Sequence, residues 1–166
     1  MKVLIIRHGP AGDSAAWEAK GRDDRSRPLT AEGKEQMRKA AAGLAVLAPD
    51  LQVLATSPLT RAFQTAEIVA EEYGCEIVPL EALEPDHGPE DAIGWLRKQQ
   101  FETVGLVGHE PHLSTLAGYL LTGKPVSFLD LKKGGACMLE VTEPPEPGVG
   151  ALQWLLTPRA LRRSGE

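Results

Sequence analysis

Short apolar runs recur along the chain and are separated by longer segments in which apolar residues return every three or four positions. The first run, at residues 3–6, consists only of Val, Leu and Ile, which is typical of a strand buried on both faces. Comparable runs predict further strands at residues 51–55, 76–78, 103–107, 137–141 and 152–156. Because helical segments separate most of these strands, the pattern predicts an α/β fold with a largely parallel sheet covered by helices on both faces.

Four of the intervening segments predict helices, at residues 30–48, 57–74, 90–100 and 111–121. Thr30 is expected to cap the first helix, and Ser57 followed by Pro58 is expected to start the second. Gly74 and Gly123 are expected to end the second and the fourth helices, because glycine readily adopts the left-handed conformation that terminates a helix.

Polar segments connect these elements. Residues 10–28 are rich in Gly, Asp, Arg and Ser and predict a surface loop, and residues 79–90 predict an acidic, Pro-rich loop. The chain contains no internal repeat, low-complexity tract or linker, and its 166 residues fit one domain. We therefore expect residues 1–166 to form a single domain.

Composition and charge narrow the classes of function. A net charge of −5 argues against a broad nucleic-acid surface but leaves room for a local basic pocket that binds an anion. Cys75 and Cys137 lie far apart without metal-type spacing, which predicts two reduced thiols. The apolar run before Arg7 is too short for a signal-peptide core or a membrane span, so we expect a cytoplasmic protein without a membrane partner.

Unusual polar residues stand where the predicted strands end. Arg7 and His8 follow the first strand, and His109 follows the fourth. Arg61 lies one turn into the helix that follows the second strand. Because ligands bind beyond the carboxyl ends of parallel strands, these side chains are expected at one edge of the sheet.

This set of residues is suited to a phosphoryl group. Two guanidinium groups match phosphoryl oxygens, a neutral His can attack phosphorus, and a second His can donate to the oxygens. We therefore expect His8 to be the nucleophile, and Arg7, Arg61 and His109 to hold the phosphate. Gly9 would let the backbone pass close behind His8 and fix its ring. These cationic groups and the lack of paired carboxylates predict that neither a metal nor another cofactor is needed.

Each residue also has an ordinary alternative. An Arg-His pair at a strand end is usually a solvated terminus, and a lone Arg on a helix usually makes a surface ion pair. A His in a strand-to-helix loop, such as His109, can simply cap backbone groups. The joint occurrence of the four residues at separate strand ends favours the functional interpretation.

The same residues resemble the motifs of the histidine phosphatase superfamily, whose members include the phosphoglycerate mutases. Arg7-His8-Gly9 after a buried strand is similar to its first motif, residues 56–66 (TSPLTRAFQTA) to its second, and Gly108-His109 to its third. Arg27-Pro28-Leu29-Thr30, followed by Gly33, also belongs to the pattern. The short length, the VGHEP sequence and the WLLTPRAL ending are most similar to the SixA branch, whose members are described as protein phosphohistidine phosphatases.

The resemblance implies a phosphoglycerate mutase-like fold and hydrolysis of phosphoryl groups through a phosphohistidine formed on His8. For the SixA branch it implies a phosphoprotein substrate, with a histidine phosphocarrier as one candidate partner. Alternatives are a phosphatase of small phosphoesters or sugar phosphates, and a non-catalytic phosphate-binding module. The chain is too short for the insertions that close over the substrate in mutases, so we expect an open site; we also expect a monomer.

The general acid of the superfamily, a Glu in the loop after the third strand, has no unambiguous match. Glu84 lies four residues before Gly88, as in many relatives, and Glu81 and Asp86 are rival candidates. A working acid at Glu84 needs a raised pKa, which like charges at Glu81 and Asp86 would supply if they lie close. The ordinary alternative for Glu84 is a solvated loop carboxylate.

Overall fold

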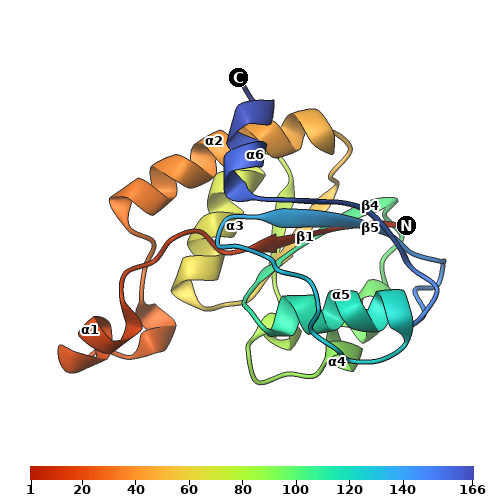
Figure 1. The fold of residues 1–166 in the computed structure, drawn as a ribbon, viewed down its shortest axis with the longest axis horizontal. Helices are drawn as coiled ribbons and strands as arrows, with labels where there is room; N and C mark the ends of the chain where they lie inside the picture. Colours follow the sequence, from red (N-terminus) through yellow and green to blue (C-terminus); the bar gives the residue numbers. More distant parts are fainter.

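Six strands form a single sheet in the order β3-β2-β4-β1-β5-β6 in the computed structural model, which describes residues 1–166 (Figure 1). The first four strands in sequence pair in parallel, whereas β5 is antiparallel to β1 and β6 to β5. The predicted α/β class and largely parallel sheet are therefore confirmed. The strands are Lys2–Arg7 (β1), Val53–Thr56 (β2), Glu76–Pro79 (β3), Thr103–Gly108 (β4), Ala136–Glu140 (β5) and Ala151–Leu156 (β6).

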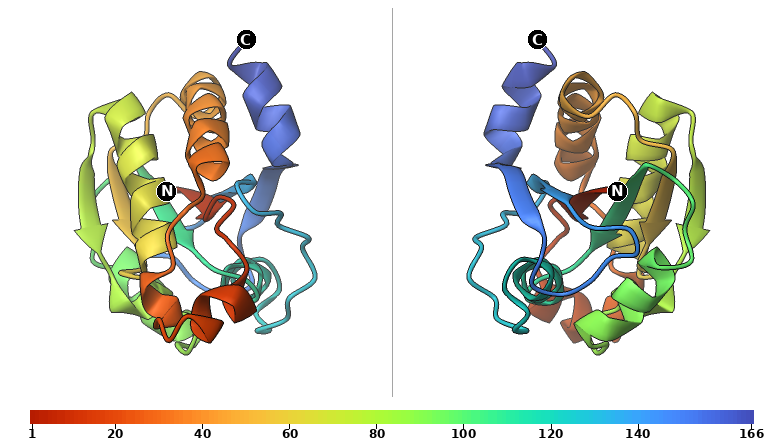
Figure 2. Two further views of the ribbon diagram at one scale, coloured as in Figure 1. Left: turned by 90° about the vertical axis from the view of Figure 1, so that its left-hand side faces the viewer. Right: turned by 90° about the vertical axis from the view of Figure 1, so that its right-hand side faces the viewer.

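Helices cover both faces of the sheet (Figure 2). One face carries α2 (Ala31–Leu47), α3 (Thr60–Tyr73) and α6 (Pro158–Ser164), and the other carries α4 (Pro89–Leu96) and α5 (His112–Thr122). None of the helices combines the length and the apolar character that crossing a membrane requires.

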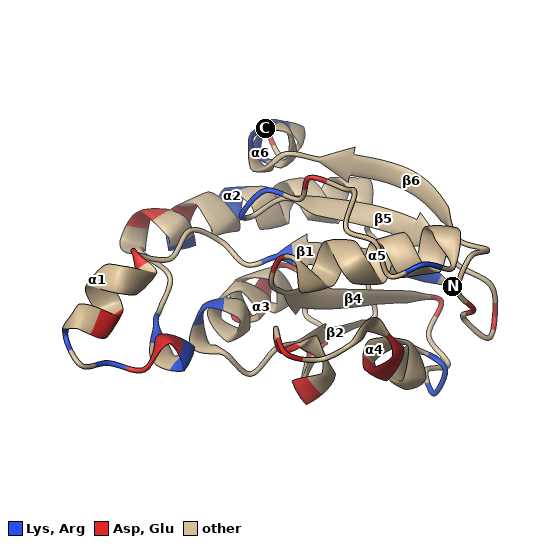
Figure 3. Cartoon of the chain, turned by 60° about the horizontal axis from the view of Figure 1, so that its bottom comes forward, with Lys and Arg blue, Asp and Glu red and all other residues tan.

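The alternation of side chains along β1 divides the core into two layers. Leu4 and Ile6 pack toward α2, α3 and α6, whereas Val3 and Ile5 pack toward α4 and α5, and all four are fully buried. Figure 3 shows the central strands almost free of charged residues, which lie mainly on helices and loops. A strand that is buried on both faces has no polar side, and this explains the continuous apolar run in the sequence.

Several predicted helix ends are confirmed. The hydroxyl of Thr30 accepts a hydrogen bond from the Gly33 amide at 2.9 Å and so caps α2. Gly74 and Gly123 follow α3 and α5 with φ values of 66° and 75°, the left-handed conformation that glycine adopts without a Cβ clash.

The predicted start of α3 at Ser57 is wrong. The Ser57 amide still donates to the Val107 carbonyl at 3.0 Å, so the chain continues the sheet ladder at this residue. The helix begins at Thr60, and no side chain caps it. The Ser-Pro pair therefore marks a connection that leaves the sheet rather than a helix cap.

Residues 10–28 are more regular than the predicted surface loop. They contain α1 (Ser14–Ala19) and the short 3-10 helix η1 (Asp24–Ser26). Asp13 and Asp23 cap these two elements through their carboxylates. Neither element contains a buried residue, so the sequence has no apolar periodicity there from which a helix could be predicted. The helix α1 projects from one end of the molecule (Figure 1).

The remaining boundaries differ in smaller ways. The helix predicted over residues 90–100 ends earlier, at Leu96, and the acidic loop contains a 3-10 turn, η2 (Glu81–Leu83).

The helix α6 was not predicted, although Thr157 caps it and Pro158 is its first residue, a recognisable start signal. Cys75 and Cys137 are free thiols, as predicted.

The crossing of α2 and α6 depends on a missing side chain. A Cβ at Gly43 would overlap the backbone carbonyl of Leu161, so the helices approach too closely for alanine. We expect Gly43→Ala to lower the free energy of unfolding by about 1–3 kcal/mol, measured by urea denaturation. Gly94→Ala in α4 is the matched control, because a Cβ there meets no atom within 4 Å. It should be neutral or stabilise by about 0.5–1 kcal/mol, and equal losses in both variants would contradict the packing argument.

Candidate active site

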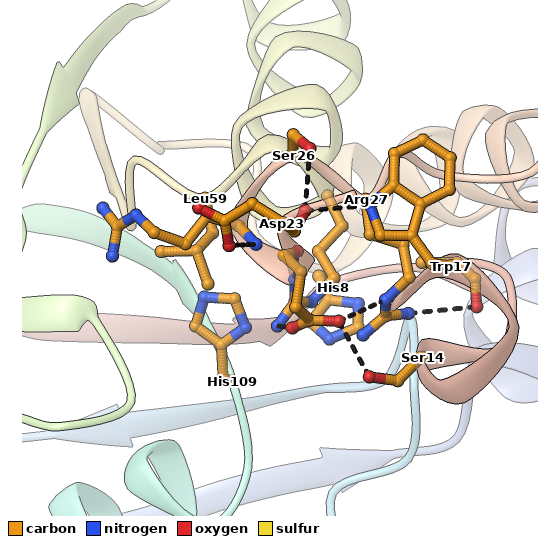
Figure 4. A network of polar contacts seen from close by, with 12 residues as sticks. His8, Ser14, Trp17, Asp23, Ser26, Arg27, Leu59 and His109 are labelled. Atoms are coloured by element: carbon orange, nitrogen blue, oxygen red, sulfur yellow. Dashed lines mark hydrogen bonds and ion pairs between the residues drawn. The ribbon is translucent and has the colours of Figure 1, made fainter. Parts of the chain in front are cut away.

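The pairing of β1 with β4 brings two histidines together. Arg7 pairs with Gly108 at the end of the ladder, so the next residues, His8 and His109, lie opposite each other just beyond it. Their ring centroids are 5.2 Å apart and their planes are tilted by 55° (Figure 4). Both residues are buried, with 5% and 3% of their surface exposed. Two stretches about one hundred residues apart in sequence therefore meet, as the strand-end argument predicted.

His8 presents Nε2 as its free nitrogen. Its Nδ1 lies 2.7 Å from the Gly9 carbonyl oxygen, which can only accept, so Nδ1 carries the proton and Nε2 the lone pair. Burial lowers the pKa of His8 to about 3; the cationic side chains of Arg61 and Arg7 also lower it, whereas the hydrogen bond to Gly9 opposes the shift. The ring is therefore neutral near pH 7 and retains its lone pair.

Gly9 links the nucleophile candidate to α3. Its amide donates to Thr65 Oγ1 at 3.0 Å, and that hydroxyl donates to the Arg61 carbonyl at 2.8 Å. A Cβ at Gly9 would lie 2.5 Å from Met37 Cγ, so a larger residue would push the backbone away from α2. The tight contact at Gly9 is thus with a side chain of α2, and it is the Gly9 carbonyl that holds the ring of His8.

His109 is held by Ser57. Its Nε2 lies 2.8 Å from Ser57 Oγ, and its Nδ1 is buried without a hydrogen-bond partner. Burial lowers the pKa of His109 to about 3, and the neighbouring His8 and Arg61 contribute to the shift. Ser57 Oγ also accepts from the Leu59 amide at 3.3 Å, and the hydroxyl keeps one proton that it can donate to Nε2. In that arrangement Nδ1 carries the ring proton.

Both predicted arginines have a buried Nε that meets no protein acceptor. Arg7 Nη1 donates to the Leu131 carbonyl at 3.0 Å, and its Nε is buried without a partner. Arg61 Nη1 donates to the Asp24 carbonyl at 2.9 Å, and its Nε is likewise buried and unpartnered. Burial lowers the pKa of Arg61, and the nearby Arg27 adds to this shift, but a guanidinium remains charged in proteins.

Asp24, in η1, is a site residue that the sequence analysis missed. Its Oδ1 accepts from Arg27 Nε at 2.8 Å and from Ser14 Oγ at 2.9 Å, and its Oδ2 lies 3.2 Å from Arg61 Nη2. The hydrogen bond from Arg27 is the main cause of the lowered pKa of Asp24. Asp24 is one of several acidic residues in a polar segment. The only signal in the sequence is its position three residues before Arg27, a spacing that allows an ion pair.

The structure places Glu84 in an ion pair with a cation from η1. Arg25 Nη1 and Nη2 donate to its carboxylate at 2.5 and 3.2 Å. This contact lowers the pKa of Glu84, whereas a working general acid at this position would need a raised pKa. The lowered pKa favours the ordinary alternative, a loop carboxylate, because the opposite charge of Arg25 at hydrogen-bond distance stabilises the ionised form.

Comparison with known proteins places the chain among histidine phosphatases. The sequence model of the histidine phosphatase superfamily (branch 1) matches residues 3–88. An uncharacterized protein of Picosynechococcus sp. is 34% identical over 139 residues, which cover 81% of this chain and 82% of that protein. Phosphohistidine phosphatase SixA of Escherichia coli (strain K12) is 27% identical over 170 residues, which cover 98% of this chain and 97% of SixA.

The fold agrees with these matches. A solved structure of the protein histidine phosphatase SixA complexed with tungstate has a TM-score of 0.80 and 26% identity, covering 97% of this chain and 99% of that chain. A probable phosphoglycerate mutase, GpmB, of Serratia proteamaculans is 37% identical over 78 residues, which cover 47% of this chain and 34% of GpmB. The likeness to SixA thus extends over nearly the whole chain, and the likeness to GpmB over about half of it.

The two buried histidines should make folding depend on pH. In the unfolded chain a His titrates near pH 6.5, so below that pH the unfolded state binds protons at His8 and His109 that the folded state excludes down to about pH 3. Their contribution to stability is therefore complete above about pH 6.5 and is lost as the pH falls, by about 1.4 kcal/mol per pH unit for each His.

Replacing His8 isolates its share of this dependence. We expect His8→Gln to reduce the pH slope of the unfolding free energy by about one proton, or about 1.4 kcal/mol per pH unit, between about pH 4.5 and 6. Urea denaturation in phosphate-free buffer measures both slopes. An unchanged slope would mean that His8 is already protonated in the folded protein.

Proposed function

The chain belongs to branch 1 of the histidine phosphatase superfamily, and from that membership we propose that it is a metal-independent phosphatase that transfers a phosphoryl group to His8 and then to water. One observation carries the proposal. Beside the neutral, oriented His8, three buried nitrogens lack any protein partner, namely Arg7 Nε, Arg61 Nε and His109 Nδ1. Unpaired buried polar groups are costly, and a phosphoryl group supplies the acceptor oxygens that would satisfy them.

In the first step, Nε2 of His8 attacks phosphorus in line with the leaving group. The Nε2–P bond forms while the bond from phosphorus to the leaving group breaks, and the leaving group departs with the electron pair. The hydrogen bond from Nδ1 to the Gly9 carbonyl holds the ring in position while positive charge develops on it. Arg7 and Arg61 supply positive charge to the non-bridging oxygens, where negative charge is concentrated.

In the second step, water attacks phosphorus and the P–Nε2 bond breaks, which returns the electron pair to His8 and releases inorganic phosphate. His109 donates to a phosphoryl oxygen through Nδ1 while Ser57 holds its Nε2. A bound phosphoryl dianion would oppose the lowering of the His109 pKa, so the ring can gain positive charge when the anion is present.

We propose phosphohistidine on a protein as the substrate, and a histidine phosphocarrier is one candidate partner. Two observations support this choice: the likeness to SixA extends over nearly the whole chain, and Arg25 keeps Glu84 ionised. An imidazole leaves more easily than an alkoxide and depends less on a protonated acid. Small phosphoesters or sugar phosphates are the second candidate, supported by the likeness to GpmB. A purely phosphate-binding module would need the arginines but not an oriented, neutral His8.

The nucleophile can be trapped. Rapid acid-free quenching with a labelled phosphohistidine protein should yield a phosphoenzyme whose label is on His8, is released by acid and is stable to base. His8→Ala should abolish both the label and turnover, because no other nitrogen takes its place. His87→Ala, which alters an exposed loop histidine, serves as the control and should keep both. Substantial turnover by His8→Ala would refute the nucleophile assignment.

Leaving-group dependence tests both the substrate class and Glu84. We expect Glu84→Gln to have small and equal effects on phosphohistidine, aryl phosphate and alkyl phosphate hydrolysis, since an ion-paired carboxylate has no proton to give. A working general acid would instead show an alkyl-specific loss of roughly 10²–10⁴-fold. In wild type, kcat/KM should be highest for the phosphohistidine protein; a preference for an alkyl phosphate would favour the small-phosphoester alternative.

A further inference from the structure

A guanidinium has two edges that can each present two parallel N–H groups, one formed by Nη1 and Nη2 and the other by Nε and Nη2. Asp24 binds the first edge of Arg61: its carbonyl accepts from Nη1 at 2.9 Å, and its Oδ2 lies 3.2 Å from Nη2. The second edge carries the buried Nε that has no protein partner. The protein therefore occupies one edge of Arg61 and leaves the other without an acceptor.

We propose that Asp24 is a positioning residue that turns the Nε edge of Arg61 toward the phosphoryl group. This role rests on the proposed function, because it assumes that Arg61 binds the phosphoryl oxygens. Asp24 would act through Arg61 and would not itself touch the substrate. Side-on binding through Nε and Nη2 would give two donors to one phosphoryl group while Nη1 remains on Asp24.

The carboxylate of Asp24 is itself held firmly. Its Oδ1 receives hydrogen bonds from Arg27 Nε and Ser14 Oγ, and Arg27 Nη1 in turn donates to the Gly12 carbonyl at 2.7 Å. Arg27 is buried, with 8% of its surface exposed, whereas α1 and η1 contain no buried residue. Polar contacts that converge on Asp24 thus attach this segment to the site.

The charges explain why an acid is needed between the two arginines. Arg27 and Arg61 repel each other, and this repulsion contributes to the lowered pKa of Arg61, which Asp24 opposes. Without the carboxylate charge, Arg61 would keep its bond to the Asp24 carbonyl but lose its counter-charge, and repulsion by Arg27 would turn the guanidinium away. The same negative charge also repels an incoming anion. If Asp24 positions Arg61, removing its charge should weaken anion binding; if Asp24 merely competes with the anion for Arg61, removing its charge should strengthen anion binding.

Asp24→Asn separates these two effects, because the amide keeps the size of the side chain and removes its charge. The matched control is Asp23→Asn, since the Asp23 carboxylate accepts only from the Arg25 amide and asparagine caps equally well. Orthovanadate, which mimics five-coordinate phosphorus, is the binding probe, and kcat/KM on an aryl phosphate is the second readout. Both are measured for wild type, Asp24→Asn, Arg61→Ala and the double variant.

We expect Asp24→Asn to weaken vanadate binding and to lower kcat/KM by about tenfold, and Asp23→Asn to leave both within about twofold. In the Arg61→Ala background, Asp24→Asn should have no further effect, because its only route to the phosphoryl group is gone. A merely structural role of Asp24 would produce the same loss in both backgrounds and would overturn the proposal. Tighter vanadate binding in Asp24→Asn would also overturn it, and would identify Asp24 as a competitor of the anion.

Ser14→Ala provides a second variant in case Asp24→Asn unfolds the segment. It removes one hydrogen bond to Asp24 without changing any charge, and Ser14 lies on the exposed helix α1. A smaller loss in the same direction, absent in the Arg61→Ala background, is expected, and no loss would count against the proposal. If Arg61→Ala itself leaves vanadate binding and turnover unchanged, the proposed function fails at Arg61; if only the Asp24 and Ser14 variants are silent, the positioning role alone fails.

Discussion

The parallel pairing of β1 with β4 is the constraint on which the arrangement of the site depends. The ladder runs from Lys2 and Thr103 to Arg7 and Gly108, and its register leaves His8 and His109 opposite each other at the carboxyl edge. A shift by one residue would turn every side chain of β1 to the other face of the sheet. The buried side chains would then no longer fit the helices that they pack against. The core thus fixes the distance between the two rings.

The antiparallel strand β5 secures this edge from the other side. The Arg7 amide donates to the Gly135 carbonyl at 3.1 Å, and the Gly134 amide donates to the carbonyls of Arg7 and His8 at 3.1 and 3.0 Å. Because β5 runs in the opposite direction, the chain enters it at the edge where the parallel strands end. The backbone on both sides of His8 is therefore held by neighbouring strands, which leaves little freedom for the ring.

Burial of these strand ends determines their chemistry. Removal from water favours neutral imidazoles at His8 and His109. Arg61 is also partly removed from water, and it lies near another cation, Arg27. A buried cation needs a counter-charge, which in this protein comes from Asp24 rather than from the sheet. One of the four side chains predicted from strand ends, Arg61, is therefore paired with a residue from a segment outside the core.

The sequence was sufficient where burial or backbone conformation leaves a local pattern. The apolar run of β1, the Thr30 cap and the glycines that end α3 and α5 could all be recognised, and the rule that ligands bind at strand ends identified Arg7, His8, Arg61 and His109 as one group. Contacts between distant polar residues leave no such pattern. Asp24 and Arg61 are 37 residues apart, and Arg25 and Glu84 are 59 apart, so neither ion pair could be predicted. Similarly, Ser57 was interpreted as a helix cap from its local sequence. Its hydrogen bond to His109 joins residues that meet only in the folded sheet, so it could not be predicted.

The two ion pairs from η1 also bear on the role of Glu84. Asp24 and Arg25 are neighbours in sequence, yet one contacts Arg61 and the other contacts the loop after β3. A segment without buried residues depends on such polar contacts, and Glu84 provides one of them. An exposed ion pair contributes little to global stability, but it can restrict a short segment that carries a residue of the site. Glu84 must be ionised to bind Arg25, so the same contact that helps to hold Asp24 in place removes the proton that a general acid would need.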